Sequence, residues 1–235
     1  MSTGETVAAR EAGNGGPADG TPLLSLRGVG KNFGPVRALS HVDLDIPAGQ
    51  VTALAGDNGA GKSVTIKTIS GLWPPDDGEI LWQGQSVHLH GPKDAEALGI
   101  RTIRSIRMPV ASLSGGQRQS VAVAKAVLFK AQLVIMDEPT AALGVSQTRQ
   151  VLDLIKRLSS QGVAVILVSH NLNDVFEVAD RIAVLYLGHM VAVDEAAKFD
   201  RQSVVEYMTT GQSERALQAN GGGAGSNPQG SEREQ

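Results

Sequence analysis

Apolar and polar residues follow two kinds of pattern along the chain, and the N-terminal part predicts strands. In residues 23–29 and 42–46 the two types alternate, as they do in strands that bury one face. Residues 51–55, VTALA, form a short apolar run, which is typical of a strand buried on both faces. The sequence PAGQ before this run predicts a turn. The chain is therefore expected to begin with three strands.

Farther along, strand patterns alternate with helix patterns. The segment VTIKTISGL has the apolar spacing of a helix, with Gly71 as a C-terminal stop. In a second block, the strand LVIM precedes a helix over residues 147–158 and a further strand, VAVILV. Strands that alternate with helices imply a parallel sheet, so the pattern predicts an α/β fold. A hairpin around Gly188 and a helix over residues 202–209 follow, whereas residues 91–113 give no clear pattern.

The composition limits both the core and the partners of such a fold. The chain has 235 residues, enough for one domain; 41% are hydrophobic but only 3% are aromatic, so we expect an aliphatic core. The net charge of -3 argues against a nucleic-acid partner, because no general positive field is available to hold a phosphate backbone. The absence of cysteine excludes disulfides and thiolate metal sites.

The two ends of the chain differ from the middle. Residues 1–21 and 212–235 are rich in small and polar residues without apolar periodicity, so we expect disordered tails around one domain over residues 22–211. No apolar stretch is long enough for a membrane span, and the N-terminal residues lack the apolar core of a signal peptide. The protein is therefore expected in the cytoplasm, and a partner would have to hold it at any membrane.

A phosphate-binding motif joins the third predicted strand to the helix that follows. Residues 56–63, GDNGAGKS, fit the pattern G-x-x-x-x-G-K-[ST] in the strand-to-helix context that validates it. Successive backbone N–H groups converge on phosphate oxygens, Lys62 reaches the β and γ phosphates, and the Ser63 hydroxyl ligates Mg²⁺. A glycine-rich turn that only begins a helix is the alternative. The predicted nucleotide-binding residues of this loop are Gly56, Asn58, Gly59, Ala60, Gly61, Lys62 and Ser63.

Two acidic residues follow the apolar run LVIM. Asp137 and Glu138 would lie at the carboxyl end of a strand, the edge at which open α/β sheets bind ligands. Asp137 would hold Mg²⁺, directly or through water, and Glu138 would polarise the attacking water as a general base. An Asp-Glu-Pro sequence can also be an ordinary turn, but the phosphate loop in the same chain favours the functional interpretation.

Two further segments supply candidate phosphate contacts. The sequence LSGGQRQ precedes a predicted helix, so Ser114, Gly115, Gly116 and Gln117 would present backbone N–H groups to a second phosphate cluster. An ordinary Ser-capped helix is the alternative, and the pattern alone does not exclude it. His170 follows the strand VAVILVS and would donate a hydrogen bond to a γ-phosphate oxygen, although a single histidine after a strand is more often structural.

Four motifs in this order, GDNGAGKS, LSGGQRQ, LVIMDEPT and LVSHN, resemble those of the ABC transporter ATPases across residues 23–211. The resemblance implies a three-layer P-loop NTPase (RecA-like) core with a small antiparallel β subdomain. It also implies a head-to-tail dimer around two ATP molecules, in which residues 114–117 of one chain complete the site of the other. Phe33 matches the aromatic residue that stacks on adenine, and Val64 stands where a hydroxyl residue usually lies beside the α phosphate.

Longer segments of the sequence are similar to the ATP-binding subunits of bacterial monosaccharide importers of the ribose and fructose type. The segments that carry this likeness are GDNGAGKS, DEPTAALGV and SHNLNDVFEVADRIAVLYLGH. The implied partners are a second copy of the chain, a transmembrane permease and, indirectly, a sugar-binding protein. The implied location is the inner face of the cell membrane.

The chain departs from the family pattern before LSGGQRQ. The family has a glutamine loop and a helical subdomain there, yet GIRTI runs directly into RSIRMPVASLSGGQ, with no glutamine between Gln85 and Gln117. We therefore expect a truncated helical subdomain. Gly144 also stands where an aspartate usually contacts the partner cassette.

Three hypotheses follow from these motifs and departures. The first is an ATPase subunit of a sugar-type importer. The second is a degenerate module that binds ATP but does not couple hydrolysis to transport, because the segment before the signature is short. Soluble ABC proteins that act on ribosomes or DNA are the third, and the sequence supports them least because it has no second cassette, coiled arm or basic surface.

Overall fold

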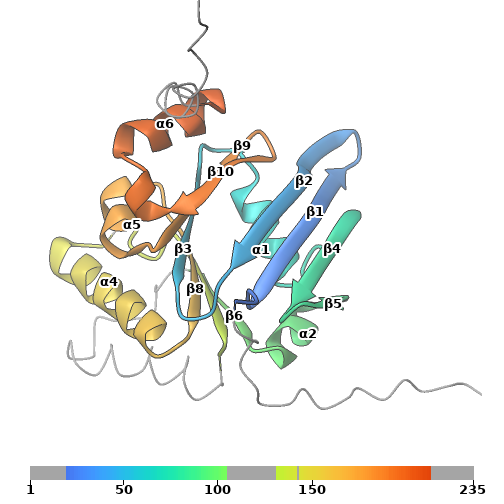
Figure 1. Ribbon diagram of the computed structural model, residues 1–235, viewed down its shortest axis with the longest axis horizontal. Coiled ribbons are helices and arrows are strands. Elements are labelled where there is room, and N and C mark those ends of the chain that lie inside the picture. The colour runs from blue at the N-terminus through green and yellow to red at the C-terminus, as the bar shows by residue number, and fades with distance from the viewer. Residues whose placement is uncertain (1–19, 105–130, 142, 213–235) are drawn as a thin grey trace, which may run out of the picture.

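Two sheets and the helices around them make up the part of the chain that the computed structural model describes, residues 20–104, 131–141 and 143–212 (Figure 1). One sheet has four strands and the other has six. The sequence LSGGQRQ, the predicted truncated helical subdomain and most of both predicted tails lie outside these residues.

The four-stranded sheet is the small antiparallel subdomain, with the spatial order β2-β1-β4-β5. β1 pairs antiparallel with β2 on one side and with β4 on the other. Its first two strands extend beyond the predicted segments because residues 32–37, where they meet, are exposed and lose the apolar alternation. The strands are β1 (Leu24–Phe33), β2 (Val36–Ile46), β4 (Asp77–Trp82) and β5 (Gln85–Val87).

The six-stranded sheet has the order β10-β9-β3-β8-β7-β6. All neighbouring pairs from β9 to β6 are parallel, which confirms the predicted parallel sheet, and β10 adds an antiparallel edge. β6 falls in the segment whose pattern was unclear. The strands are β3 (Val51–Gly56), β6 (Ile100–Arg104), β7 (Leu133–Asp137), β8 (Ala164–Val168), β9 (Arg181–Tyr186) and β10 (His189–Glu195).

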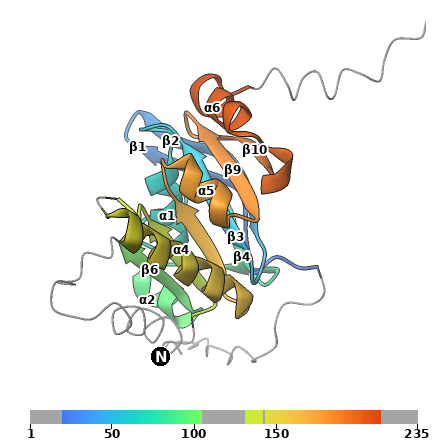
Figure 2. The same ribbon diagram turned by 90° about the vertical axis from the view of Figure 1, so that its left-hand side faces the viewer.

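Helices cover both faces of the parallel sheet and produce three layers (Figures 1 and 2). α1 lies on the same side as the antiparallel sheet, and α4 and α5 lie on the other side with α6 beyond them. The predicted helices over residues 147–158 and 202–209 are confirmed as α4 and α6. The helices are α1 (Lys62–Ile69), α2 (Pro92–Ala97), α4 (Val145–Ser160), α5 (Leu172–Val178), η2 (Ala196–Lys198, a 3₁₀ turn) and α6 (Arg201–Thr210).

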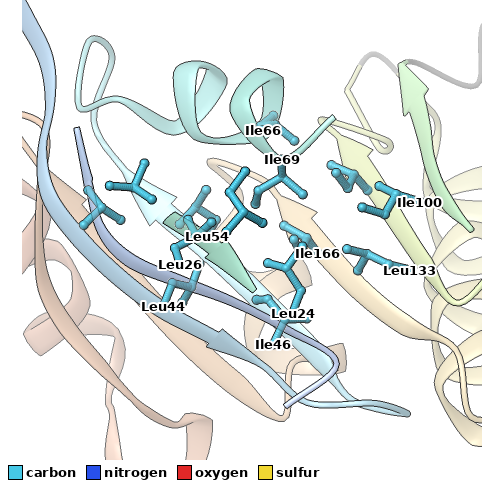
Figure 3. Packing of buried hydrophobic residues seen from close by; sticks show 14 of the residues in the cluster. Leu24, Leu26, Leu44, Ile46, Leu54, Ile66, Ile69, Ile100, Leu133 and Ile166 are labelled. Atoms are coloured by element: carbon cyan, nitrogen blue, oxygen red, sulfur yellow. The ribbon is translucent and has the colours of Figure 1, made fainter. Parts of the chain in front are cut away.

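The parallel sheet divides an aliphatic core into two halves. Along β8, Ile166 and Val168 pack toward α1 and the antiparallel sheet, whereas Val165 and Leu167 pack toward α4. This alternation follows from the two-residue period of a strand, so every side chain of a sheet covered on both faces is buried. Figure 3 shows the half between α1 and the antiparallel sheet, with Leu54 of β3 at its centre.

Among the helices that the structure describes, none has both the length and the apolar character needed to cross a membrane.

Candidate functional site

The phosphate-binding motif forms a tight loop between β3 and α1. Gly56, Gly59 and Gly61 have positive φ angles of 154°, 81° and 108°. A Cβ atom at Gly56 would lie 2.6 Å from the Leu185 carbonyl oxygen, and one at Gly61 would lie 2.8 Å from the Leu39 side chain. At Gly56 and Gly61, glycine is therefore required both because φ is positive and because a Cβ atom would have no room.

A cavity of about 640 Å³ opens over this loop. It is bounded by the loop and α1 on one side and by the ends of β7 and β8 on the other. The predicted loop residues line it except Ala60, whose side chain is buried in the core and whose role in binding would be limited to its backbone. The lining residues are Ala38, Gly56, Asp57, Asn58, Gly59, Gly61, Lys62, Ser63, Val64, Asp137, Glu138, Val168, His170 and Met208.

Lys62 lines the cavity, and its ammonium group is bound by the loop. Its Nζ donates to the carbonyl oxygens of Gly56 (2.7 Å) and Asp57 (2.9 Å). Burial lowers the pKa of this ammonium below its ordinary value of 10.5, and the negative charges of Glu138, Asp57 and Asp137 oppose that change. An ammonium so desolvated is stabilised by any ligand that brings negative charge, which suits a triphosphate.

Glu138 and His170 meet at the edge of the parallel sheet because β7 and β8 are neighbours with Asp137 opposite Val168. The backbone N–H of Glu138 donates to the Val168 carbonyl (2.8 Å), which continues the ladder past the end of β7. The backbone N–H of His170 donates to Glu138 Oε1 (3.1 Å), and His170 Nδ1 lies 2.8 Å from Glu138 Oε2. Two of the three residues predicted to be catalytic, Glu138 and His170, are thus in direct contact, and the third is Lys62 of the phosphate loop.

The side chains of Glu138 and His170 are close, but the hydrogen bond between the two residues is the one from the His170 backbone N–H to Glu138 Oε1. Glu138 Oε2 is buried and accepts no hydrogen bond within the part of the chain that the structure describes, although His170 Nδ1 lies near it. The His170 side chain is 73% exposed and lines the cavity, so its hydrogen bond to a γ-phosphate oxygen stays a prediction.

Glu138 also has an unusual backbone conformation. Its φ of 50° lies in the left-handed region, which costs about 1–2 kcal/mol for a residue with a Cβ atom. The next residues are anchored as well, since Thr140 Oγ1 donates to the buried carboxylate of Asp174 on α5 (2.7 Å). The loop after β7 is therefore held in the conformation that directs Glu138 toward the cavity.

The oxygen groups of the site fit a magnesium ion that is bound together with a nucleotide. Ser63 and Asp137 line the main cavity and also a small adjoining one, so both face the same space. Mg²⁺ is commonly held by one or two such protein oxygens together with phosphate oxygens. Within the described residues there is no group of three or more His, Cys, Asp or Glu side chains that could hold a metal ion.

Phe33 lies apart from the phosphate end of the site. It ends β1, its side chain is 40% exposed, and its ring packs edge-on against Trp73 with 4.8 Å between centroids. It is not among the residues that line the 640 Å³ cavity. The predicted Ser114, Gly115, Gly116 and Gln117 lie outside the described residues.

Four residues that line the cavity were not predicted as site residues: Ala38, Asp57, Val168 and Met208. Asp57 and Val168 lie inside the motifs GDNGAGKS and LVSHN, but neither residue was singled out there. Ala38 and Met208 come from β2 and α6, which reach the cavity only through tertiary packing. No local sequence signal indicates either of them.

Comparisons with known proteins show the family of this chain. A family model described as "ABC transporter" matches residues 39–102 and 93–141. The xylose/arabinose import ATP-binding protein XylG of Sulfolobus acidocaldarius is 38% identical, with 80% of this chain and 94% of that protein covered. The fructose import ATP-binding protein FrcA of Rhizobium meliloti is 37% identical with the same coverage.

The ribose import ATP-binding protein RbsA of Caldanaerobacter subterraneus is 32% identical, and the chain covers 47% of it. The chain therefore spans about half of that longer relative. In the alignment with XylG, 236 positions are compared although only 80% of the 235 residues of this chain are included. That relative therefore contains residues that have no counterpart here.

Solved structures agree on the fold. A nucleotide-free ATP-binding cassette from an ABC transporter superposes with a TM-score of 0.67 at 20% identity, covering 78% of this chain and 97% of that one. A dimeric cassette, MJ0796 bound to ADP and Pi, gives a TM-score of 0.59 at 21% identity, covering 74% and 98%. The motifs, the fold and the relatives lead to one conclusion: the chain belongs to the ABC transporter family of ATP-binding proteins.

Proposed function

We propose that this chain hydrolyses Mg·ATP in the 640 Å³ cavity and that hydrolysis drives import of a monosaccharide through a permease at the inner face of the cell membrane. One observation carries the catalytic part: the phosphate loop lies opposite Asp137 and Glu138, and His170 contacts the same glutamate. The sugar is proposed from the xylose/arabinose, fructose and ribose import proteins that the chain resembles.

Each group has a role suited to its position. Lys62 and the backbone N–H groups of residues 56–63 bind the phosphates, and Ser63 and Asp137 hold the magnesium ion, which when bound screens the charge of the phosphates. Glu138 accepts a proton from the attacking water, and His170 fixes the carboxylate that does so. A second copy of the chain, docked head to tail, contributes residues 114–117 to the same site.

The first prediction concerns Glu138. Its replacement by Gln keeps the shape of the side chain but removes the proton acceptor, so we expect kcat for ATP hydrolysis to fall by about 100- to 10,000-fold. The affinity for Mg·ATP should stay within a few fold. Steady-state phosphate release and equilibrium binding measure the two quantities.

Glu79→Gln, at an exposed position on β4, is the matched control and should hydrolyse ATP as the unmodified chain does. Two results would contradict the proposed catalytic role. One is equal turnover in Glu138→Gln and the unmodified chain, and the other is no magnesium-dependent turnover in the unmodified chain.

A second candidate function is a module that binds ATP without coupling it to transport. The observation that favours it is the family match in two segments, 39–102 and 93–141, as expected when family sequence between them is absent. Sedimentation of Glu138→Gln with ATP separates the candidates, because a coupled cassette should form a dimer when hydrolysis is blocked. ATP binding with monomer mass throughout would support the second candidate.

A further inference from the structure

Two rows of side chains lead outward from the nucleotide cavity. On β2, Ala38 lines the cavity and Val36, two residues earlier, lies on the same face of the strand. Phe33 of β1 is directly opposite Val36 in the antiparallel register and shares that face. On α1, Val64 lines the cavity and Lys67 lies one turn farther along the same side. Phe33 and Lys67 therefore lie at the outer ends of two rows of side chains that begin at the cavity.

Trp73 connects these two rows. Its ring packs edge-on against Phe33, with centroids 4.8 Å apart and an interplanar angle of 70°. Lys67 Nζ lies 3.9 Å from the centroid of the Trp73 ring, within the range of a cation–π contact. Trp73 thus contacts the last residue of β1 and a residue of the helix that begins at the phosphate loop.

The segment that carries Trp73 is fixed to β1. Lys31 Nζ donates to the Pro74 carbonyl (2.7 Å) and to Asp76 Oδ1 (2.8 Å), and the Asn32 backbone N–H donates to Asp76 Oδ2 (2.6 Å). The hydrogen bonds from Lys31 and Asn32 hold the pKa of Asp76 below its ordinary value. Because these anchors lie next to Phe33 in the chain, the two rings keep their mutual orientation without a ligand.

We propose that Trp73, supported by Lys67, is a positioning residue for recognition of the nucleotide base. Its contact with Phe33 holds the Phe33 ring in place, and the exposed part of the Phe33 ring is left free to contact the base. This inference rests on the proposed ATP-binding function. Phe33 is 40% exposed, so part of its aromatic surface is open to a ligand. A planar base stacks favourably on an aromatic ring, and a T-shaped aromatic partner stabilises the ring on which it packs.

The experiment compares Mg·ATP with magnesium tripolyphosphate, which has the same charged chain but no base. Titration calorimetry should show that Trp73→Ala weakens Mg·ATP binding by about 3- to 10-fold while tripolyphosphate affinity changes by less than about 2-fold. Trp73→Phe, which keeps an aromatic edge, should retain most of the ATP affinity. Leu72→Ala, at an exposed neighbouring apolar position, is the matched control and should change neither affinity.

Equal losses for both ligands would mean that Trp73 acts through the phosphate loop, and no loss for ATP would mean that it has no part in base recognition; either result overturns the inference. If the unmodified chain bound neither ligand, the proposed function itself would fail. A selective loss for ATP in Leu72→Ala would also overturn the assignment to Trp73.

A second readout avoids any change at Trp73. The chain has two tryptophans, and Trp82 is buried in β4. In Trp82→Phe, Trp73 is the sole emitter, and its fluorescence should change on addition of Mg·ATP but not of tripolyphosphate. The same change with both ligands, or with neither, would contradict contact between the base and the Phe33–Trp73 pair.

Discussion

Burial and charge act in opposite directions on the ammonium group of Lys62. Desolvation in the loop lowers its pKa, while Glu138, Asp57 and Asp137 favour the protonated form. A bound triphosphate adds negative charge beside the same group, so nucleotide binding should raise the pKa again. In the alkaline range just below 10.5, the complex therefore holds more protons at Lys62 than the free protein does.

We accordingly expect Mg·ATP binding to take up protons in that range, and the affinity to decrease as pH rises through the lowered pKa. The sign follows because the state that binds more protons is favoured at lower pH. Calorimetry in two buffers with different ionisation enthalpies measures the uptake. Lys62→Arg is the control, since a guanidinium stays protonated; the same uptake in that variant would assign the protons to another group.

The chemical identity of the site residues was predictable because motif and context specify them together. Lys62, Ser63, Asp137 and Glu138 each follow from a short pattern beside a strand. The left-handed backbone of Glu138 and its contact with His170 were not predictable from that pattern. Both depend on β7 lying next to β8 in the sheet.

At the scale of elements, a part-buried hydrogen bond ties the loop after β7 to α5. Thr140 Oγ1 donates to Asp174, whose residue is only 6% exposed. The sequence indicated no helix at α5, because a seven-residue helix gives little periodicity. The hydrogen bond therefore links the loop after β7, a strand that the sequence predicted, to α5, a helix that it did not predict.

Replacing Thr140 by Val keeps the shape of the side chain but leaves the Asp174 carboxylate without this donor. We expect the free energy of unfolding to fall by about 1–3 kcal/mol, measured by urea denaturation. Thr140→Ser keeps the hydroxyl and should lose much less. Equal stability of Thr140→Val and the unmodified chain would show that the contact does not hold the loop.

The inner strands of the parallel sheet, which is covered on both faces, were the most predictable elements. β3, β7 and β8 are continuous apolar runs because helices or the second sheet lie on each side of them. β4 and β5 gave no such signal, since most of their residues are exposed. Their pairing with β1 arises from contacts between segments far apart in the sequence.

At the scale of the whole molecule, the cavity is assembled from separate parts of the fold. The loop after β3, the ends of β7 and β8, Ala38 of β2 and Met208 of α6 all contribute to it. The motif residues could be found from the sequence, but Ala38 and Met208 could not, because only the layered packing brings β2 and α6 to this edge.

The arrangement of the whole molecule also separates the binding of nucleotide from the coupling of hydrolysis to transport. The phosphate loop and the acidic edge lie within the described core, whereas the family match is divided between residues 39–102 and 93–141. The groups that we propose to bind the phosphates first, in a single chain, all lie in this core. Coupling to a permease would depend on sequence that this chain has in a shortened form.

Calorimetric titration of Mg·ATP into the purified chain and into Lys62→Ala tests the central claim most directly. The account predicts saturable heat from the unmodified chain and an affinity about 10- to 100-fold lower in Lys62→Ala, because a charge-assisted contact to phosphate is lost. Lys93→Ala, at an exposed position on α2, should bind as the unmodified chain does. No saturable heat from the folded chain, or equal affinity in Lys62→Ala, would contradict nucleotide binding at this loop.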